Sequence, residues 1–265
     1  MRLKDKVILV TASTRGIGYA IVQACAAEGA IVYMAARNEE KAEARIAEAK
    51  EKGHIVKFVY NDATKPETFR TMIEDVVEKE GRIDGLVNNF GISNPKSDLD
   101  IEHTKIEDFL KFLNLNTSSV FIASQAAIPH MKKNGGGSIV NISSIGGIIP
   151  DISQIAYGAS KASIIHMSKM IAIQEARSNI RCNVVAPGMT ATDSVKDNLN
   201  DHFQEIFLKN TPIKRMARPD EIAAAVVYFM SDEAAYATGQ VLAVAGGFGL
   251  GTPLFGDLAD ALTDR

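Results

Sequence analysis

A tyrosine and a lysine stand four residues apart in the segment YGASK at positions 157–161. Because the segment lies within a long helical pattern, Tyr157 and Lys161 are expected on one helix face. A tyrosine hydroxyl titrates at about pH 10 in water, which is too high for a general base at neutral pH. A positive charge about 4 Å away is worth about 4 kcal/mol at an effective dielectric of about 20, or about three pKa units. Lys161, assisted by the positive charge of a bound oxidised cofactor, is therefore expected to bring the pKa of Tyr157 close to neutrality.

Ser144 supplies a hydroxyl that can join this pair. It ends a predicted strand thirteen residues before Tyr157, so its side chain is expected at the carboxyl edge of a sheet, where open α/β sheets bind ligands. A hydroxyl there would hold a substrate oxygen and stabilise the alkoxide charge that develops on it. The neighbouring Ser143 competes for this role, and the spacing to Tyr157 favours Ser144.

The segment TASTRGIG at positions 11–18 follows the first predicted strand and opens a helix. Backbone N–H groups in such a turn can face a pyrophosphate, since glycine permits close approach and a helix N-terminus contributes about half a positive charge. A tight turn that binds nothing is the alternative, and the position directly after a buried strand favours the phosphate site. The predicted contacts are Ser13, Arg15, Gly16, Ile17 and Gly18.

The second predicted strand ends in AARN at positions 35–38, where a dinucleotide site that accepts NAD usually carries an acidic residue. No carboxylate is present there, and Arg37 occupies the place where the 2′-phosphate of NADP would sit. Arg15, in the turn itself, is a second candidate for that phosphate. Two such contacts would favour NADP by about two orders of magnitude, even after a discount for exposure. Two solvated surface arginines are the alternative.

These groups need a sheet that presents them at one edge. Seven short apolar runs alternate with amphipathic stretches, which predicts βαβ units. Their continuous apolar character indicates strands that are buried on both faces. The expected fold is α/β, a single Rossmann-type doubly wound parallel sheet of seven strands with helices on both faces. The runs are Val7–Val10, Ile31–Met34, Ile55–Tyr60, Ile83–Asn88, Ile139–Ile142, Cys182–Ala186 and Val241–Val244.

Helices are predicted between the strands, where apolar residues recur at helical spacing. Pro129 lies inside one of these patterns and should end or kink that helix. The predicted helices pass through Ile17 and Ala24, and then cover Glu39–Lys52, Pro66–Glu80, Ile106–Met131, Ala156–Arg177 and Pro219–Ser231.

The chain is expected to form one domain over residues 1–265, with 46% hydrophobic and 23% charged residues. The stretch 189–210 follows a Pro-Gly pair and has the length of a substrate lid. Residues 249–265 form a tail beyond the last predicted strand. Apolar side chains that could cover a substrate are Met189, Val195, Leu199, Phe203, Ile206 and Phe207 in the lid, and Phe248, Leu250, Leu254 and Phe255 in or beside the tail.

The formal charge of -3 argues against nucleic acid or an anionic membrane as a partner, because both require clustered basic residues. Small molecules and copies of the chain are the expected partners. The two cysteines, Cys25 and Cys182, form neither a disulfide framework nor a metal motif, which fits a reducing cytoplasm. The first residues run directly into a short strand, so we expect no export signal and no membrane span.

Six motifs, TASTRGIG, NNFG, NLNTSSVF, IVNISS, YGASK and PGMTAT, occur in the order found in short-chain dehydrogenases/reductases, which the chain resembles over nearly its whole length. The resemblance implies hydride transfer between a nicotinamide ring and a secondary alcohol or ketone, a tetramer, and a catalytic set of Ser144, Tyr157, Lys161 and Asn116. Asn116, favoured over Asn114, would distort its helix and free a carbonyl for a water that relays protons through Lys161.

The same resemblance implies further cofactor contacts. Asp62 would contact the adenine, and Thr192 would reach the nicotinamide carboxamide. Two residues depart from the family pattern, since Ala12 replaces the first glycine of the turn and Phe90 replaces the alanine of NNAG and adds bulk near the cofactor. The remaining implied contacts are Ala63, Asn89, Gly91, Tyr157, Lys161, Gly188 and Thr190.

Within that family, the sequence is most similar to bacterial 7α-hydroxysteroid dehydrogenases of bile acids, including the segments at 150–157 and 246–253. This implies NADP-dependent oxidation of a steroid 7α-hydroxyl to the 7-ketone. The main alternative is a 3-oxoacyl carrier-protein reductase, which usually ends soon after the last strand. An enoyl reductase spaces its tyrosine and lysine more widely, and a cofactor-binding regulator need not keep the catalytic set. The tail could cap a steroid site, pack against a neighbouring subunit or fray.

Overall fold

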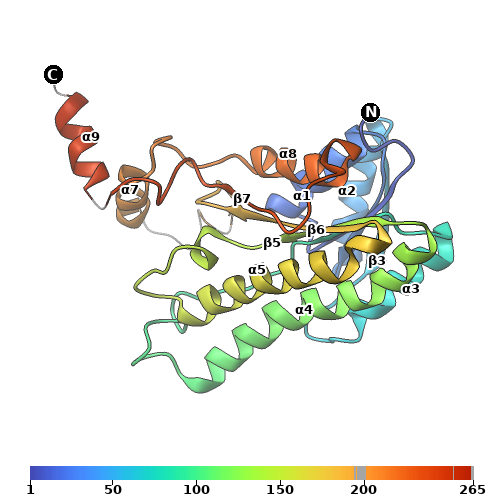
Figure 1. The fold of residues 1–265 in the computed structure, drawn as a ribbon, viewed down its shortest axis with the longest axis horizontal. Helices are drawn as coiled ribbons and strands as arrows, with labels where there is room; N and C mark the ends of the chain where they lie inside the picture. The colour runs from blue at the N-terminus through green and yellow to red at the C-terminus, as the bar shows by residue number, and fades with distance from the viewer. Residues whose placement is uncertain (194, 196–200, 253, 264–265) are drawn as a thin grey trace.

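A computed structural model of the protein describes residues 1–193, 195, 201–252 and 254–263. Their seven strands form one parallel sheet in the order β3-β2-β1-β4-β5-β6-β7, with helices on both faces (Figure 1). This confirms the predicted fold class. The strands are β1 (Val7–Thr11), β2 (Ile31–Ala36), β3 (Ile55–Tyr60), β4 (Gly85–Asn88), β5 (Gly137–Ile142), β6 (Ile180–Pro187) and β7 (Val241–Val244).

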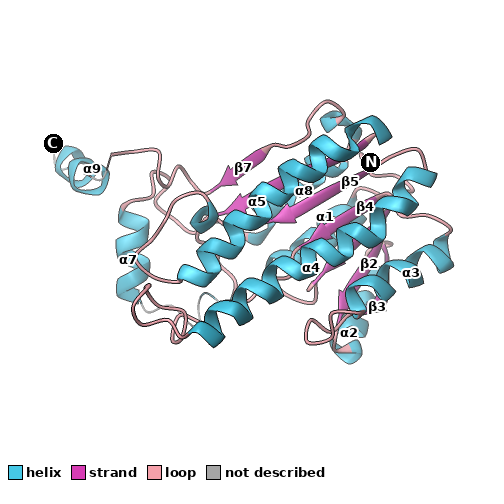
Figure 2. Cartoon of the chain, turned by 60° about the horizontal axis from the view of Figure 1, so that its bottom comes forward, coloured by secondary structure: helices cyan, strands magenta, loops and turns pink. Residues whose placement is uncertain are grey.

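Two layers of helices enclose the sheet (Figure 2). One layer contains α1 (Gly16–Ala27), α2 (Glu39–Glu51) and α8 (Pro219–Met230), and the other contains α3 (Thr68–Glu80), α4 (Ile106–Lys133) and α5 (Ile155–Glu175). Outside the layers lie α7 (Asp201–Lys209) and α9 (Phe255–Thr263), with short 3-10 helices at η1 (Ile145–Gly147), η2 (Ala176–Ser178) and η3 (Asp232–Ala234). Within the described part of the chain, none of the helices is both long and apolar enough to cross a membrane.

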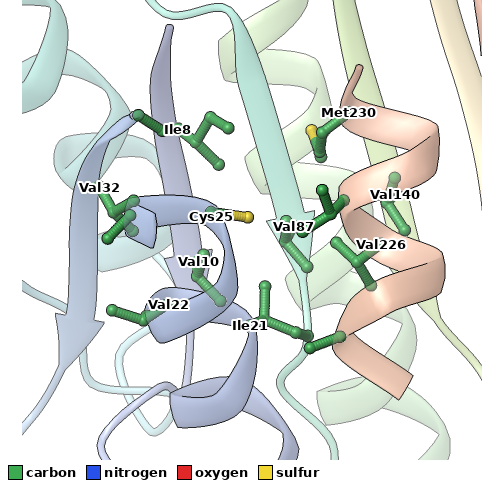
Figure 3. Close-up of a cluster of buried hydrophobic side chains, with 14 of the residues drawn as sticks. Ile8, Val10, Ile21, Val22, Cys25, Val32, Val87, Val140, Val226 and Met230 are labelled. Atoms are coloured by element: carbon green, nitrogen blue, oxygen red, sulfur yellow. The ribbon is translucent and has the colours of Figure 1, made fainter. Parts of the chain in front are cut away.

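The core on the α1 side joins two helices to the central strands (Figure 3). Ile21, Val22 and Cys25 of α1 and Val226 and Met230 of α8 are each at most 1% exposed. Complete burial of an aliphatic side chain of this size stabilises the fold by about 1.5 to 3 kcal/mol. This packing fixes the start of α1 against the end of β1, where the predicted phosphate-binding turn lies.

The two edge strands differ from the prediction that every strand is buried on both faces. Ile55 and Tyr60 of β3 are 52% and 40% exposed, and Leu242 of β7 is 40% exposed. An edge strand has a neighbour on one side only, so part of its surface stays open to solvent even where its residues are apolar.

Helix α4 does not end at Pro129, one of the two outcomes predicted for that residue. It continues to Lys133. Proline removes one helical hydrogen bond, but Ala127 and Met131 on either side of it are completely buried against the sheet. This packing holds the last turn of the helix in place.

A row of buried polar side chains crosses the sheet beneath its carboxyl edge. The Asn88 amide donates to the Asn141 side-chain oxygen at 2.8 Å and to the Ser124 hydroxyl at 3.3 Å. The Asn141 amide in turn donates to the Ser168 hydroxyl at 2.7 Å. Asn141 is completely buried. Buried amides that satisfy one another in this way favour one arrangement of the strands and helices that carry them.

We predict that Asn141→Ala lowers the free energy of unfolding by about 2 kcal/mol, because the Asn88 amide and the Ser168 hydroxyl lose a buried partner. For a protein of this size, the melting temperature should fall by about 4 to 8 °C. Asn114→Ala is the matched control, since Asn114 is an exposed residue of α4. Thermal unfolding followed by circular dichroism tests this, and equal melting temperatures for the two variants would contradict it.

Candidate active site

A cavity of about 970 Å³ opens at the carboxyl edge of the sheet. The strand order reverses between β1 and β4, and loops on the two sides of such a switch point leave a crevice for a ligand. The loops after β1, β4, β5 and β6 all contribute to the wall. The predicted site residues that line the cavity are Ile17, Asn89, Gly91, Ser144, Tyr157, Lys161, Gly188, Thr190 and Thr192.

The other predicted residues lie beside or behind this cavity. Those for the phosphate and adenosine positions lie on the turns after β1, β2 and β3, which end side by side at the same edge. Asn116 is completely buried in α4. The residues outside the cavity lining are Ser13, Arg15, Gly16, Gly18, Arg37, Asp62, Ala63 and Asn116.

The turn after β1 has the backbone that a bound phosphate requires. Gly16 adopts a φ of +56°, and a Cβ at Gly18 would lie 2.5 Å from the Ala12 carbonyl oxygen, so only glycine fits there. Ala12 itself has a φ of +51°. The alanine that replaces a glycine therefore adopts a glycine-like conformation, which costs an L-residue about 1 to 2 kcal/mol. The Asn89 amide donates to the carbonyls of Thr11 and Ala12, both at 3.1 Å, and ties the turn to the loop after β4.

The N-terminus of α1 can receive an anion. Arg15 precedes the helix without a side-chain capping bond, and the first turn contains no acidic residue. Backbone N–H groups at such a helix start are free to bind a phosphate, with the helix dipole adding to the attraction. Arg15 and Arg37 are both exposed, and neither forms an ion pair with any residue that the structure describes. This set of donors and charges fits a dinucleotide that carries an additional phosphate.

The structure shows the surroundings of two predicted cofactor contacts, Ser13 and Asp62, and of Phe90, whose packing the sequence left open. The Ser13 hydroxyl is buried and donates to the Val10 carbonyl at 2.9 Å, so only its backbone faces the turn. Hydrogen bonds from Thr64 lower the pKa of Asp62, and the charge of Arg37 acts in the same direction. Phe90 packs edge-on against Phe69, with ring centroids 5.8 Å apart. The bulk of Phe90 thus fills the core beside α3 and does not line the cavity.

Tyr157 and Lys161 lie in the first two turns of α5, beside Ser144 at the end of β5. The Lys161 Nζ donates to the Ile142 carbonyl at 3.1 Å and lies 5.6 Å from the centroid of the Tyr157 ring. A Cβ at Gly91 would lie 2.8 Å from this Nζ. Any side chain at position 91 would therefore require the lysine ammonium to shift.

The two titrating groups respond to burial in opposite directions. Burial lowers the pKa of Lys161 to about 8. Burial raises the pKa of Tyr157, and a hydrogen bond with Ser144 offsets only part of this increase. The prediction that Lys161 and an oxidised nicotinamide together bring the pKa of Tyr157 close to neutrality stays a prediction. In the protein alone, removal of the phenolate from water outweighs the groups around it.

Both polar atoms of the Asn116 side chain form hydrogen bonds. Its oxygen accepts from the Ile92 N–H at 2.8 Å, and its amide donates to the Ile92 carbonyl at 3.0 Å and to the Ser160 hydroxyl at 2.9 Å. The Ser160 hydroxyl donates to the Tyr157 carbonyl at 2.7 Å. Helix α4 is continuous through Asn116, and the Ser119 hydroxyl donates to the Asn116 carbonyl at 3.0 Å. A carbonyl oxygen has two lone pairs, so this bond leaves one for a further donor such as the implied relay water.

Sequence reasoning missed the connecting residues. Ser160 links Asn116 to the backbone of Tyr157, and its position three residues after Tyr157 on the helix was the available signal. The Ser143 hydroxyl is buried and donates to the Lys161 carbonyl at 2.8 Å. Both serines line the cavity, but the Ser143 hydroxyl is bound to the Lys161 carbonyl, whereas the Ser144 hydroxyl bonds Tyr157.

The lid contributes more to the cavity wall than the tail does. Met189, Val195, Phe203 and Phe207 line the cavity, and Leu199 lies outside the described residues. Phe207 also stacks on Phe248 with ring centroids 4.2 Å apart. The predicted lid and tail residues that do not line the cavity are Ile206, Phe248, Leu250, Leu254 and Phe255.

Helix α9 projects from the body of the molecule beside α7 (Figure 1). Lys209 of α7 forms ion pairs with Asp257 at 2.8 Å and Asp260 at 3.5 Å. Leu250 and Leu254, just before α9, are 88% and 60% exposed. The tail is therefore joined to the lid helix by charge, and these leucines cover no part of the cavity.

Comparisons with known proteins identify the family. Residues 11–249 match a short-chain dehydrogenase/reductase family model described as "Enoyl-(Acyl carrier protein) reductase". The chain is 50% identical over 256 residues to a 7alpha-hydroxysteroid dehydrogenase of Clostridium sardiniense, which covers 97% of this chain and 98% of that protein. It is 39% identical over 248 residues to a 3-oxoacyl-[acyl-carrier-protein] reductase of Thermotoga maritima, covering 93% and 99%.

A solved 7α-hydroxysteroid dehydrogenase, complexed with NADH and 7-oxo glycochenodeoxycholic acid, has the same fold with a TM-score of 0.88 and 32% identity. The match covers 93% of this chain and 95% of that one. The chain therefore belongs to the short-chain dehydrogenase/reductase family of oxidoreductases that act on CH–OH groups.

Proposed function

We propose that the protein is an NADP-dependent 7α-hydroxysteroid dehydrogenase, which reversibly oxidises the 7α-hydroxyl of bile acids to the 7-ketone. The observation that carries the proposal is the meeting of Ser144, Tyr157 and Lys161 in one cavity of about 970 Å³. This size is near the upper end of the range for small-ligand sites and leaves room for a rigid steroid. Similarity to the 7alpha-hydroxysteroid dehydrogenase of C. sardiniense supports position 7.

Tyr157 is the proposed proton-transfer group. During oxidation its phenolate accepts the proton of the substrate hydroxyl, and the Ser144 hydroxyl donates a hydrogen bond to the same oxygen. When bound, the nicotinamide accepts or returns the hydride, and its positive charge in the oxidised form favours the phenolate. Lys161 adds a second cation below its pKa of about 8. Burial raises the pKa of Tyr157, and both cations act against this increase.

Asn116 completes the proposed set as a positioning residue. Its amide holds Ser160, which in turn holds the Tyr157 backbone. The same side chain anchors the loop after β4 through Ile92. Asn116 therefore couples the cofactor side of the site to the helix that carries Tyr157.

NADP is the proposed cofactor because the end of β2 offers a cation, Arg37, and no carboxylate for the ribose hydroxyls. Arg37 and Arg15 would bind the 2′-phosphate, and the uncapped start of α1 would bind the pyrophosphate. The proposed contacts are Ser13, Arg15, Gly16, Ile17, Gly18, Arg37, Asp62, Ala63, Asn89, Gly91, Tyr157, Lys161, Gly188, Thr190 and Thr192.

A 3-oxoacyl carrier-protein reductase is the second candidate, supported by the 39% identity to the enzyme of T. maritima. The same residues would serve its ketone reduction. The apolar lid side chains Phe203 and Phe207 in the cavity wall favour a steroid over a narrow acyl chain. The four-residue spacing of Tyr157 and Lys161 argues against an enoyl reductase.

We also propose that copies of the chain associate as a homotetramer in the cytoplasm. Helices α4 and α5 lie side by side on one outer face (Figure 2). Phe121 of α4 and Ile173 of α5 are 54% and 78% exposed. Apolar side chains this exposed on paired helices are typical of surfaces that another subunit covers.

Tyr157→Phe is expected to reduce kcat by about 10²- to 10⁴-fold, because only the proton-transfer hydroxyl is lost. The dissociation constant of NADP+ should change by less than about twofold. NADPH formation followed by absorbance and NADP+ titration by calorimetry measure the two effects. Tyr228→Phe, at a partly exposed tyrosine of α8, is the control. Near-normal turnover of Tyr157→Phe would exclude the assigned role.

Arg37→Ala is expected to weaken NADP+ binding by about 10- to 100-fold with little effect on NAD+, since only NADP+ carries the 2′-phosphate. Calorimetric titration with both cofactors gives the comparison. Arg70→Ala, on the surface of α3, should bind both cofactors normally. Equal losses for the two cofactors would show that Arg37 supports the fold and not the phosphate.

Cholic and chenodeoxycholic acids, which bear a 7α-hydroxyl, are expected to reduce NADP+, whereas deoxycholic acid lacks this group and should not react. Ursodeoxycholic acid, the 7β epimer, should also fail, because inversion turns the reacting C–H bond away from the nicotinamide while the oxygen stays on Tyr157 and Ser144. Initial rates of NADPH formation for the four acids test this. Oxidation of deoxycholic acid would show that another hydroxyl reacts. Absence of activity with all four acids would favour the 3-oxoacyl carrier-protein reductase.

A further inference from the structure

The helix that carries Tyr157 begins without a local cap. Gln154 precedes α5 with a left-handed φ of +58°, and its side chain makes no capping hydrogen bond. The first N–H groups of a helix have no partner within it, so they need acceptors from elsewhere. At α5 these groups include the backbone N–H of Tyr157 itself.

A segment more than fifty residues earlier in the chain supplies the acceptors. One carboxylate oxygen of Asp98 accepts from the Ala156 N–H and the other from the Tyr157 N–H, both at 2.9 Å. The Asp98 carbonyl accepts from the Gln154 N–H at 3.2 Å, and the Leu99 carbonyl accepts from the Ile155 N–H at 3.1 Å. The whole first turn of α5 is thus held by two consecutive residues.

The polar atoms of the Asp98 side chain are satisfied by these backbone bonds. The side chain is completely buried, and no cationic side chain in the described part of the chain pairs with it. Burial of a carboxyl group is costly unless its oxygens accept hydrogen bonds, and a helix N-terminus provides both donors and a favourable dipole. An asparagine at position 98 would offer one acceptor oxygen in place of two. Its NH2 group would then face the N–H of either Ala156 or Tyr157, and two donors cannot bond each other.

The Asp98 segment also forms part of the cavity wall. Its neighbours Asn94, Leu99 and Asp100 line the cavity that contains Tyr157. The segment is held in shape by bonds from the Asp98 N–H to the Asn94 carbonyl at 2.9 Å and from the Leu99 N–H to the Thr104 hydroxyl at 2.8 Å. Asp98 therefore joins the substrate-facing wall to the start of the helix that carries the reacting phenol.

We propose that Asp98 is a positioning residue for proton transfer by Tyr157. Its carboxylate sets the place of the first turn of α5 relative to Ser144 and the cavity wall, so it determines where the phenol oxygen meets the substrate oxygen. Displacements of about 1 Å in such a geometry can cost about 10²-fold in rate. The inference rests on the proposed role of Tyr157 in hydride-transfer chemistry.

Asp98→Asn in the full-length protein is expected to lower kcat for cholic acid by at least about tenfold, with the NADP+ dissociation constant changed by less than about twofold. Amide hydrogen exchange of Ala156 and Tyr157 should become faster, because one of these groups loses its acceptor. Asp84→Asn is the matched control. Asp84 accepts from the Val7 N–H at 2.8 Å at the opposite edge of the sheet, so this variant should lose stability and retain kcat.

A kcat loss in Asp98→Asn no greater than in Asp84→Asn, or an equal loss of NADP+ affinity, would overturn the proposal. If Asp98→Asn does not fold, Thr104→Ala loosens the same segment while keeping the carboxylate. It should lower kcat severalfold, and an unchanged kcat would also overturn the proposal. If the wild-type protein is inactive on cholic acid, the steroid assignment is refuted but the role of Asp98 is not. Asp98→Asn and Asp84→Asn would then be compared in the reduction of an acetoacetyl thioester.

Discussion

The ammonium group of Lys161 is buried in the cavity wall, and the ends of two strands are arranged around it. Removal from water disfavours the charged form and lowers the pKa to about 8. The end of β5 provides the Ile142 carbonyl as an acceptor, and the loop after β4 approaches so closely that a Cβ at position 91 would displace the ammonium. A shift at the end of either strand would therefore change the electrostatic environment of Tyr157 through the lysine.

The buried amides beneath the site give this arrangement its rigidity. Asn88 and Asn141 are paired residues of the neighbouring strands β4 and β5, and their side chains bond across the sheet. Each of the two is followed in the chain by a residue of the site. Asn89 follows Asn88 and donates to the Thr11 carbonyl in the turn after β1, and Ile142 follows Asn141 and accepts from the Lys161 ammonium. A slip of either strand would leave buried amide donors unpaired. The register of the sheet and the geometry of the site are thus linked at the same two residues.

The parts of the site that are local in the chain could be predicted from the sequence. The glycines of the turn and the spacing of Tyr157 and Lys161 express constraints that act over a few residues, as does the periodicity that identified the strands and helices. The rise in the pKa of Tyr157 depends on burial that only the assembled fold creates. The acceptors at the start of α5 come from Asp98, fifty-eight residues before Ala156, and no local pattern connects the two. The exposure of Ile55 reflects the position of β3 at the sheet edge, which also depends on topology.

The left-handed backbone of Ala12 has a consequence for the entropy of ligand capture. A glycine at this position would sample many conformations, and binding would have to select one of them. The alanine methyl group removes most of those alternatives, although its φ of +51° is itself unfavourable. The backbone conformational entropy at this position is therefore lost when the chain folds and not when a phosphate binds. The protein gives up some thermodynamic stability for a turn that is already preorganised when its ligand binds.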